Sequence, residues 1–344
     1  MKIIDLRSDT ITLPTKAMRE AIFRAEVGDD VFEEDPTVNR LEEIAAGRVG
    51  KEAALLVASG TMANLTCTLT HCARGEEVIL GDRSHIFLNE AGGMSALGGI
   101  HPHTLPNQPD GTIRLDAIES AIRGNNVHFP RTRLICLENT HNRCDGMALT
   151  PEYCDAVADL AKKHGLQLHI DGARIFNAAV AQNIDVKEIT RGADSLSFCL
   201  SKGLSAPVGS LVCGTRKFIA EARRNRKILG GGMRQAGIIA AAGIEALEQM
   251  VDRLSEDHVN ARRLAEGVAQ IEGLSIDLSR VQTNIIYFKV TSSRVTGEQL
   301  LTRLDEKGVK TFLTGAETFR MVTHYGIEES DIDAALSVIR AAMQ

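Results

Sequence analysis

Short runs of apolar residues recur along the first two thirds of the chain and predict buried strands. Each run is rich in Val, Ile and Leu and is bounded by Gly, Asp or Asn; the runs are Ala53–Ser59, Glu76–Asp82, Arg133–Asn139, Leu166–Gly172, Ser195–Ser201 and Gly209–Gly214. Continuous apolar character, without strict alternation, is typical of strands that are covered on both faces of a mostly parallel sheet. We therefore expect such a sheet at the centre of the fold.

Segments with helical periodicity lie between these runs, and Thr150–Gly165 is the clearest of them. Thr150 is a good helix cap, Pro151 is suited to the first helical position, and Gly165 is a typical end. Strands that alternate with helices predict an α/β fold with helices on both faces of the sheet.

The pattern changes near residue 250. Residues 233–273 are helical almost throughout, with an expected apolar face of Ile238, Ala242, Leu247, Val251, Leu254 and Val259. Beyond them we expect a strand, a helix, a strand and a final helix at 283–290, 297–308, 319–325 and 328–343. A chain of 344 residues also exceeds one core of ordinary size. We therefore predict a large domain over residues 1–250, with an N-terminal arm, and a small α+β domain over 251–344.

Composition and charge argue against a nucleic-acid partner. Hydrophobic residues make up 44% of the chain, charged residues 24%, and the net charge is −6. The densest basic run is Arg223–Lys227, which is short enough to be one solvated helix face. We therefore expect no nucleic-acid partner.

The chain also lacks the marks of export. Asp5, Arg7 and Asp9 interrupt the N-terminus too early for a signal peptide. No segment reaches the roughly 18 apolar residues that a membrane span needs. The seven cysteines form no C-x-x-C pair and, with the histidines, no zinc pattern. We expect a cytoplasmic protein without disulfides, metal or membrane contact.

Chemically capable residues follow the predicted strands. Because ligands of open α/β sheets bind at the carboxyl ends of the strands, these positions are the first candidates. Gly60, Thr61 and Met62 follow one strand and open a helix, which suits a phosphate. His85, Asp171 and Lys202 follow three other strands.

Each of these residues also has an ordinary structural explanation. The glycine turn is a common connection, His85 is an ordinary loop residue, Asp171 has Arg174 as a nearby ion-pair partner, and most lysines are exposed. Together, however, they match what pyridoxal phosphate requires. A lysine forms a Schiff base with its aldehyde, a carboxylate keeps its pyridine nitrogen protonated, and a helix N-terminus holds its phosphate.

Several longer motifs carry a more specific resemblance. The stretches DLRSDT, GDDVFEEDP, SGTMAN, LENTHN, HIDGARIFNA, CLSKGLSAPVGS and GGGMRQAG resemble the threonine aldolases, which share the aspartate-aminotransferase fold of pyridoxal-phosphate enzymes. The resemblance covers nearly the whole chain. It implies a large domain with a mostly parallel sheet, a smaller C-terminal α+β domain and a homotetramer, a dimer of dimers.

The resemblance also implies roles for individual residues. Lys202 would bond covalently to the cofactor, Asp171 would pair with its pyridine nitrogen, and His85 would stack on its ring. The phosphate would be held by Gly60, Thr61 and Met62, and the substrate carboxylate by Ser8, Arg174 and Arg320. The substrate hydroxyl would be met by His128. A neighbouring subunit's site would receive Lys227 and Arg234. Arg174 is counted among the cofactor contacts as well.

The implied reaction is the retro-aldol cleavage of L-threonine or L-allo-threonine to glycine and acetaldehyde. The base that takes the hydroxyl proton is left open between His85, His128 and a water molecule. After LENTHN this chain reads RCDGMALTPEY, where relatives usually carry a shorter turn with glycine. The preference for the β-substituent is therefore open, and phenylserine, which would release benzaldehyde, is an alternative substrate.

Two other functions compete with this one. A β-eliminating lyase or an aminotransferase of the same fold would share Lys202 and Asp171. A nucleotide-binding α/β protein without catalytic activity is the alternative from a different class. No G-x-G-x-x-G follows a predicted strand, which counts against a dinucleotide site.

Overall fold

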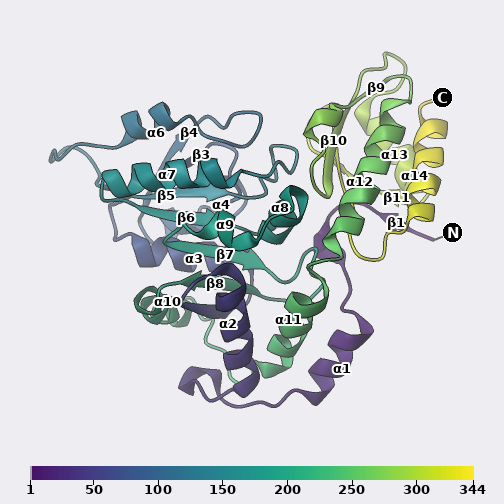
Figure 1. Ribbon diagram of the computed structural model, residues 1–344. Helices are drawn as coiled ribbons and strands as arrows, with labels where there is room; N and C mark the ends of the chain where they lie inside the picture. Colours follow the sequence, from purple (N-terminus) through teal and green to yellow (C-terminus); the bar gives the residue numbers. More distant parts are fainter. Residues whose placement is uncertain (1) are drawn as a thin grey trace.

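The computed structural model describes residues 2–344, and its centre is a seven-stranded sheet of order β2-β8-β7-β6-β5-β3-β4 (Figure 1). The strands are β2 (Ala53–Val57), β3 (Glu77–Gly81), β4 (His101–Leu105), β5 (Thr132–Glu138), β6 (Gln167–Asp171), β7 (Ser195–Cys199) and β8 (Ser210–Gly214). All neighbours from β4 to β7 are parallel, and β8 is antiparallel to β7 and β2. The predicted mostly parallel α/β sheet is confirmed, and every apolar run is a strand.

Sequence reasoning missed the edge strand β4. Its residues His101, Pro102, His103 and Thr104 are polar or unsuited to a central strand. An edge strand needs partners on one side only, so its sequence is less constrained.

The register brings the carboxyl ends of most strands to one edge of the sheet. Glu138 pairs with Asp171, and Asp171 pairs with Ser197. Because β8 is antiparallel, its first residue, Ser210, lies between Val57 and Cys199, the last residues of β2 and β7. The candidate residues that follow these strands therefore start from the same edge.

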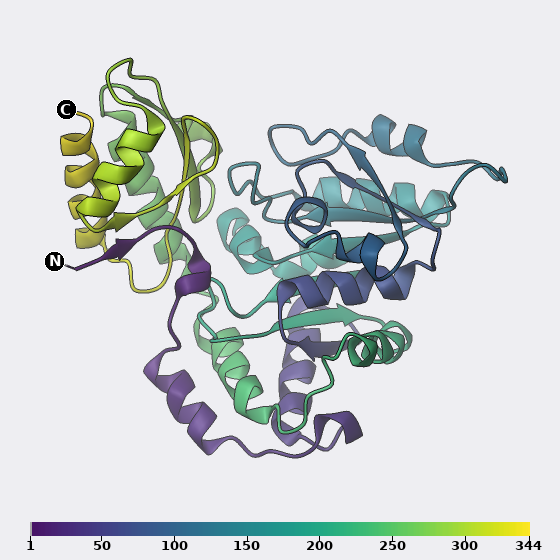
Figure 2. The same cartoon turned by 180° about the vertical axis from the view of Figure 1, so that it is seen from behind.

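Helices cover both faces of the sheet (Figures 1 and 2). One face packs on α2 (Pro36–Val49), α7 (Pro151–Lys163), α8 (Ile175–Gln182), α9 (Val186–Thr190) and α11 (Gly237–Gln249). The other face packs on α3 (Gly60–His71), α4 (His85–Leu88), α5 (Gly93–Ala96) and α10 (Arg216–Ile228). Neighbouring residues of one strand serve opposite faces, as Leu55 and Leu56 do.

The sequence signals for α7 are those that the structure uses. The Thr150 hydroxyl accepts a hydrogen bond from the Tyr153 N–H, and Pro151 is the first helical residue. Gly165 follows the helix with a φ of 66°, in the left-handed region that favours glycine.

Residues 233–273 are helical over most of their length, as expected, but as two helices without one continuous apolar face. The chain forms α11 and then α12 (Leu254–Ala269), with a turn between them. Two residues of the expected apolar face, Ile238 and Val259, are 49% and 67% exposed. The reason is that α11 buries its small residues, among them Ala240 and Ala242, so its apolar face is rotated away from Ile238.

A second hydrophobic core lies in the C-terminal part of the chain. A sheet of order β12-β13-β10-β9 packs there against three helices. The elements are β9 (Leu274–Ser275), β10 (Ile285–Val290), β12 (Phe312–Leu313), β13 (Thr318–Val322), α12, α13 (Gly297–Glu306) and α14 (Glu329–Ala342). The buried side chains pass from the first core to the second along α12, between Leu254 and Ala261.

The start of the N-terminal arm belongs to this second core. Strand β1 (Ile4–Asp5) pairs in parallel with β11 (Val309–Lys310), and Ile4 and Leu6 are buried there. Strand β1 and the C-terminal helix α14 therefore both belong to the smaller C-terminal unit, which contains the second core (Figure 1). The predicted division into residues 1–250 and 251–344 stays a prediction. The pairing of β1 with β11 had no local signal in the sequence, because the two strands are distant along the chain.

The remaining elements are the helices α1 (Lys16–Arg24) and α6 (Leu115–Ala121) and three short 3-10 helices, Asp9–Ile11, Asp30–Phe32 and Leu278–Arg280. Among the described helices, none combines the length and the apolar character that crossing a lipid bilayer requires.

Candidate active site

Asp171 is a buried carboxylate at the end of β6. It is 2% exposed, and its two oxygens accept hydrogen bonds from Asn64 Nδ2, at 2.8 Å, and from the Ala173 N–H, at 3.1 Å. Within residues 2–344 no cation pairs with it, and the alternative expectation of an ion pair with Arg174 is wrong, because Arg174 pairs with Asp9. A buried carboxylate without a counter-charge is costly. Asp171 is therefore suited to the cationic group of a ligand.

Lys202 lies in a tight turn just beyond β7. Its carbonyl accepts hydrogen bonds from the Ser205 N–H, at 2.9 Å, and from Thr12 Oγ1, at 3.1 Å. Ser205 has a φ of 63°, which a residue other than glycine seldom adopts. The side chain of Lys202 is half-buried, and among the described residues its ammonium group has no hydrogen-bond or ion-pair partner.

The N-terminus of α3 directly follows β2 at the same edge of the sheet. Ser59 caps the helix by accepting a hydrogen bond from the Met62 N–H, at 3.2 Å. The N–H groups of Gly60 and Thr61 belong to the first turn, which has no acceptors within the helix. A Cβ at Gly60 would lie 2.9 Å from Cys199 Sγ, so glycine is needed for this close approach. The helix start is a ready anion site.

His85 is held at both its backbone and its ring. Its backbone N–H donates to Glu138 Oε2 at 2.6 Å, and its Nδ1 lies 2.8 Å from Glu90 Oε1. The hydrogen bond with Glu90 raises the pKa of His85, although burial opposes this. The side chain remains one third exposed, with 33% of its surface accessible.

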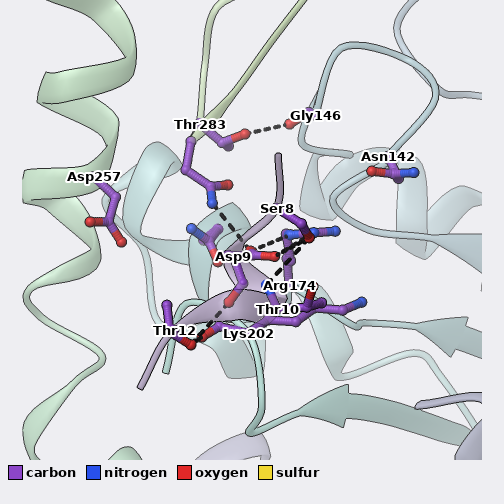
Figure 3. Close-up of polar contacts among 12 residues, drawn as sticks. Ser8, Asp9, Thr10, Thr12, Asn142, Gly146, Arg174, Lys202, Asp257 and Thr283 are labelled. Carbon is purple, nitrogen blue, oxygen red and sulfur yellow. Dashed lines mark hydrogen bonds and ion pairs between the residues drawn. The ribbon is translucent and has the colours of Figure 1, made fainter. Parts of the chain in front are cut away.

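Arg174 and Asp9 form a buried ion pair at the junction of the arm and the large sheet (Figure 3). Arg174 Nε and Nη2 each donate to one Asp9 oxygen at 2.7 Å, and Asn284 Nδ2 donates to Asp9 at 3.3 Å. Burial by itself would raise the pKa of Asp9, but the Arg174 guanidinium holds it well below its usual range. Asp9 was not predicted, although it lies within the DLRSDT motif.

Arg320, on β13, faces the same region with no carboxylate partner in the described part of the chain. Its Nη2 donates to the Arg7 carbonyl at 2.9 Å and its Nη1 to Asn142 Oδ1 at 3.1 Å, while its Nε is buried without an acceptor. Burial and the nearby Arg174 lower the pKa of Arg320. Ser8 lies in the same cluster (Figure 3). Because only Arg174 has a carboxylate partner and Arg320 has none, this pair of guanidinium groups can bind an anion.

The unusual loop after β5 borders an open cleft of about 560 Å³ between the two units. Arg143 and Asp145 of this loop line it together with Arg83, which precedes His85, and with Tyr287 of β10. The Tyr287 hydroxyl donates to the Asn142 carbonyl at 3.0 Å. Because Asn142 also accepts a hydrogen bond from Arg320, the cleft lies directly beside Arg320.

A single chain does not bring His128 to this site. His128 is exposed and precedes β5, at the amino end of that strand, whereas Glu138 and Asp171 lie at the carboxyl end. A strand of seven residues spans roughly 20 Å. The contact of His128 with the substrate hydroxyl stays a prediction, and it would require a site that more than one chain builds.

Lys227 and Arg234 also lie apart from Lys202. Lys227 is exposed in the last turn of α10. Arg234 is 54% exposed and pairs with Asp29 at 2.9 Å. Their expected role at a neighbouring subunit stays a prediction.

Comparisons with known proteins agree with this arrangement. The chain matches the family model of the beta-eliminating lyases over residues 5–291. It is 49% identical to low-specificity L-threonine aldolase 1 of Arabidopsis thaliana, over 100% of this chain and 97% of the relative. It is 46% identical to the low specificity L-threonine aldolase of Escherichia coli K12, over 96% of each chain.

Solved structures share the fold. The threonine aldolase of Leishmania major superposes with a TM-score of 0.85 at 19% identity, over 99% of this chain and 100% of that one. The serine palmitoyltransferase of Sphingomonas wittichii superposes with a TM-score of 0.78 at 18% identity, over 99% and 87%.

Proposed function

The chain belongs to the beta-eliminating lyase family and, within it, to the threonine aldolases, and from this premise we propose that it cleaves L-threonine and L-allo-threonine to glycine and acetaldehyde. One observation carries the proposal. Asp171 and Lys202, which both lack an ion-pair partner among the described residues, follow strands that end at one edge of the sheet, beside the start of α3. Other β-hydroxy-α-amino acids, such as phenylserine, are further substrates.

The donor set fits pyridoxal phosphate. Asp171 is a buried acceptor without a cation, Lys202 is an ammonium group without a partner, and α3 offers free N–H groups. Lys202 would hold the aldehyde carbon of the cofactor, Asp171 its pyridine nitrogen and the start of α3 its phosphate, while His85 would cover its ring. When bound, the cofactor supplies a sink for the electron pair that remains at Cα.

The arginines orient the substrate. Arg320 has free donors that suit a carboxylate, and Arg174 is fixed by Asp9, so that its Nη1 group is left for the ligand. A substrate carboxylate that is held at a defined place fixes the direction of the Cα–Cβ bond. Orientation of this kind lowers the activation barrier, because the entropy of positioning is already lost when the substrate binds. The residues around the cleft beside Arg320, among them Arg143 and Tyr287, would meet the β-substituent.

An amino-acid panel tests the function. The enzyme, supplied with pyridoxal phosphate, is incubated with L-threonine, L-allo-threonine, L-phenylserine and, as controls without a β-hydroxyl, L-alanine and L-aspartate. We expect glycine and one aldehyde from each hydroxylated substrate and no glycine from the controls. Keto acid without glycine would instead identify β-elimination if ammonia is released, or an aminotransferase if the keto acid forms only with an added 2-oxo acid as amino-group acceptor.

Substitution of Arg320 by Lys is expected to lower kcat/KM for L-threonine by roughly 10- to 100-fold, mainly through KM. Lysine keeps the charge but loses the planar fork, and charge-assisted hydrogen bonds contribute about 1.5–3 kcal/mol. Steady-state kinetics checks this, with Arg294→Lys on the exposed surface of the small unit as the matched control. Equal kcat/KM values for the Arg320 variant and the control would rule out carboxylate binding by Arg320.

The enzyme is an oligomer, with a homotetramer as the expected form, whose sites are shared between chains. Large apolar side chains are exposed on the arm and α10, where Phe23 is 89%, Phe32 68% and Ile228 78% exposed. Large apolar side chains that are this exposed are suited to a subunit interface. His128 lies between Val127, which is 97% exposed, and Phe129, which is 46% exposed. Such a loop is suited to contact another subunit, where His128 could meet the substrate.

Mixing two inactive variants, Lys202→Ala and Arg234→Ala, is expected to restore activity. In a dimer with shared sites, each mixed pair has one site with both residues intact. Equal mixing then gives about a quarter of the parental activity. The measurement is activity after subunit exchange, with exchange confirmed by mass spectrometry. Complete exchange without any gain in activity would argue against sharing.

A cytoplasmic location is part of the proposal. All seven cysteines are buried free thiols. A reducing compartment keeps cysteines in that form.

A further inference from the structure

Glu90 is a buried carboxylate directly behind His85, and it is not among the residues that would contact the cofactor or the substrate. It is 6% exposed and lies between α4 and α5. A single oxygen, Oε1, contacts both His85 Nδ1 and Asn64 Nδ2, each at 2.8 Å. Burial raises the pKa of Glu90, and the hydrogen bond from His85 lowers it.

This contact decides which nitrogen of His85 carries the proton. A carboxylate oxygen that already accepts an N–H from Asn64 is best completed by a second N–H donor, so Nδ1 is protonated. In a neutral imidazole the other nitrogen, Nε2, is then a free acceptor. Among the described residues Nε2 has no partner, and it lies on the ring side opposite the buried Glu90.

Asn64 links this pair to Asp171. Its Nδ2 group donates one hydrogen bond to Glu90 and another, also of 2.8 Å, to Asp171 Oδ2. One side-chain ligand atom from each of His85, Glu90 and Asp171 lies within 4.8 Å of the others. The Asn64 amide therefore holds two carboxylates at once. These are Asp171, which would pair with the pyridine nitrogen of the cofactor, and Glu90, which pairs with His85.

The orientation of the Asn64 amide is fixed from its other side. Its Oδ1 accepts from Ser197 Oγ at 2.8 Å and from His169 Nε2 at 3.2 Å. Burial lowers the pKa of His169 to about 4, so its ring is neutral and has one N–H. Because Asn64 Nδ2 donates to two carboxylates, its Oδ1 is the acceptor, so the N–H of His169 is at Nε2. His169 Nδ1 then accepts from Ser195 Oγ at 2.9 Å, and Ser195 Oγ also lies 2.7 Å from His71 Nε2. A rotated amide would set Oδ1 against two carboxylates.

We propose that Glu90 and Asn64 are positioning residues. Glu90 holds His85 in the tautomer whose Nε2 accepts the β-hydroxyl proton of the substrate, and Asn64 fixes Glu90 and Asp171 in one hydrogen-bonded unit. The inference rests on the proposed function. In the step concerned, the hydroxyl proton moves to Nε2, the O–H electron pair becomes the second bond of the aldehyde C=O, and the Cα–Cβ electron pair stays with the glycine fragment.

The test is Glu90→Gln, which keeps the shape and the acceptor oxygen and removes the charge. The first readout is ¹⁵N NMR of the histidine rings, with the parent and the variant both loaded with pyridoxal phosphate. We expect neutral His85 of the parent to be protonated at Nδ1, and its pKa to fall in the variant. A protonated ring cannot accept a proton, so kcat/KM falls as the pH drops through this pKa, and the acid limb of the profile moves to lower pH in the variant. At the optimum, kcat falls about tenfold or more.

The exposed Glu43→Gln, on the surface of α2, is the matched control, since it loses the same charge. Asn64→Ala tests the link between Asn64 and Glu90. If Asn64 acts through Glu90, the change in the pKa of His85 in the double variant should be smaller than the sum of the changes in the two single variants. If Asn64→Ala does not fold, the NMR comparison with Glu90→Gln decides alone.

A parent that forms glycine but has neutral His85 protonated at Nε2 would overturn the inference. So would an unchanged pKa of His85 in Glu90→Gln. A parent with the expected tautomer that forms no glycine would instead contradict the proposed function.

Discussion

Lys202→Ala is expected to abolish glycine formation, with a loss on the order of 1000-fold or more. In the proposed function the deprotonated amine of Lys202 is the nucleophile, and no other described lysine lies in the turn after β7. The purified variant should also lose the visible absorbance of a lysine-bound cofactor and the adduct that borohydride traps. Activity assays, absorption spectra and peptide mass spectrometry measure these effects.

The fold should survive this substitution. The Lys202 ammonium has no hydrogen bond with the described residues, and the turn is held by backbone contacts that alanine retains. The unfolding temperature should therefore change little. Lys217→Ala, exposed in α10, is the control and should keep full activity. A Lys202 variant as active as this control would remove the basis of the assignment.

Asp171→Asn is expected to retain the cofactor and to lose activity by about 100-fold or more. A neutral amide cannot balance a protonated pyridine nitrogen, and each unit of pKa that this pairing supplies corresponds to about 1.4 kcal/mol. Rates are measured at saturating pyridoxal phosphate, and cofactor binding is measured by fluorescence titration. Asp159→Asn, exposed on α7, is the control.

The structure adds a cost in stability to this variant. Both oxygens of Asp171 accept from N–H groups, of Asn64 and Ala173, so the new amide must set one donor against another. Such an unsatisfied contact costs about 1–3 kcal/mol, and the free energy of unfolding should fall by that amount. A variant whose rate stays within about threefold of the parent would exclude the role of Asp171.

Much of the large sheet could be predicted because its strands are buried on both faces. A continuous apolar run such as Val78–Leu80 is compatible with few structures other than a buried strand. The edge strand β4 and the arm strand β1 lack that signal, since His101 and Asp5 are not core residues. The break between α11 and α12 was missed because small residues such as Ala240 form the buried face, while a larger residue, Ile238, is exposed.

The candidate site divides in the same way. Asp171, Lys202, His85 and the start of α3 follow predicted strands, so the rule for strand ends finds them. Asp9, Asn64 and Glu90 were missed, because their importance lies in contacts with residues distant in sequence. Asp9 contacts Arg174 across 165 positions, and Asn64 contacts Asp171 across 107. Nothing local distinguishes them from an ordinary helix cap or a surface acid.

The central claim is that this active site breaks the Cα–Cβ bond of threonine. The most direct measurement follows uniformly ¹³C-labelled L-threonine by NMR in the presence of the enzyme and pyridoxal phosphate. We predict labelled glycine and labelled acetaldehyde in equal amounts, and neither product with Lys202→Ala. Labelled 2-oxobutyrate with release of ammonia, and no glycine, would contradict the account and identify β-elimination instead.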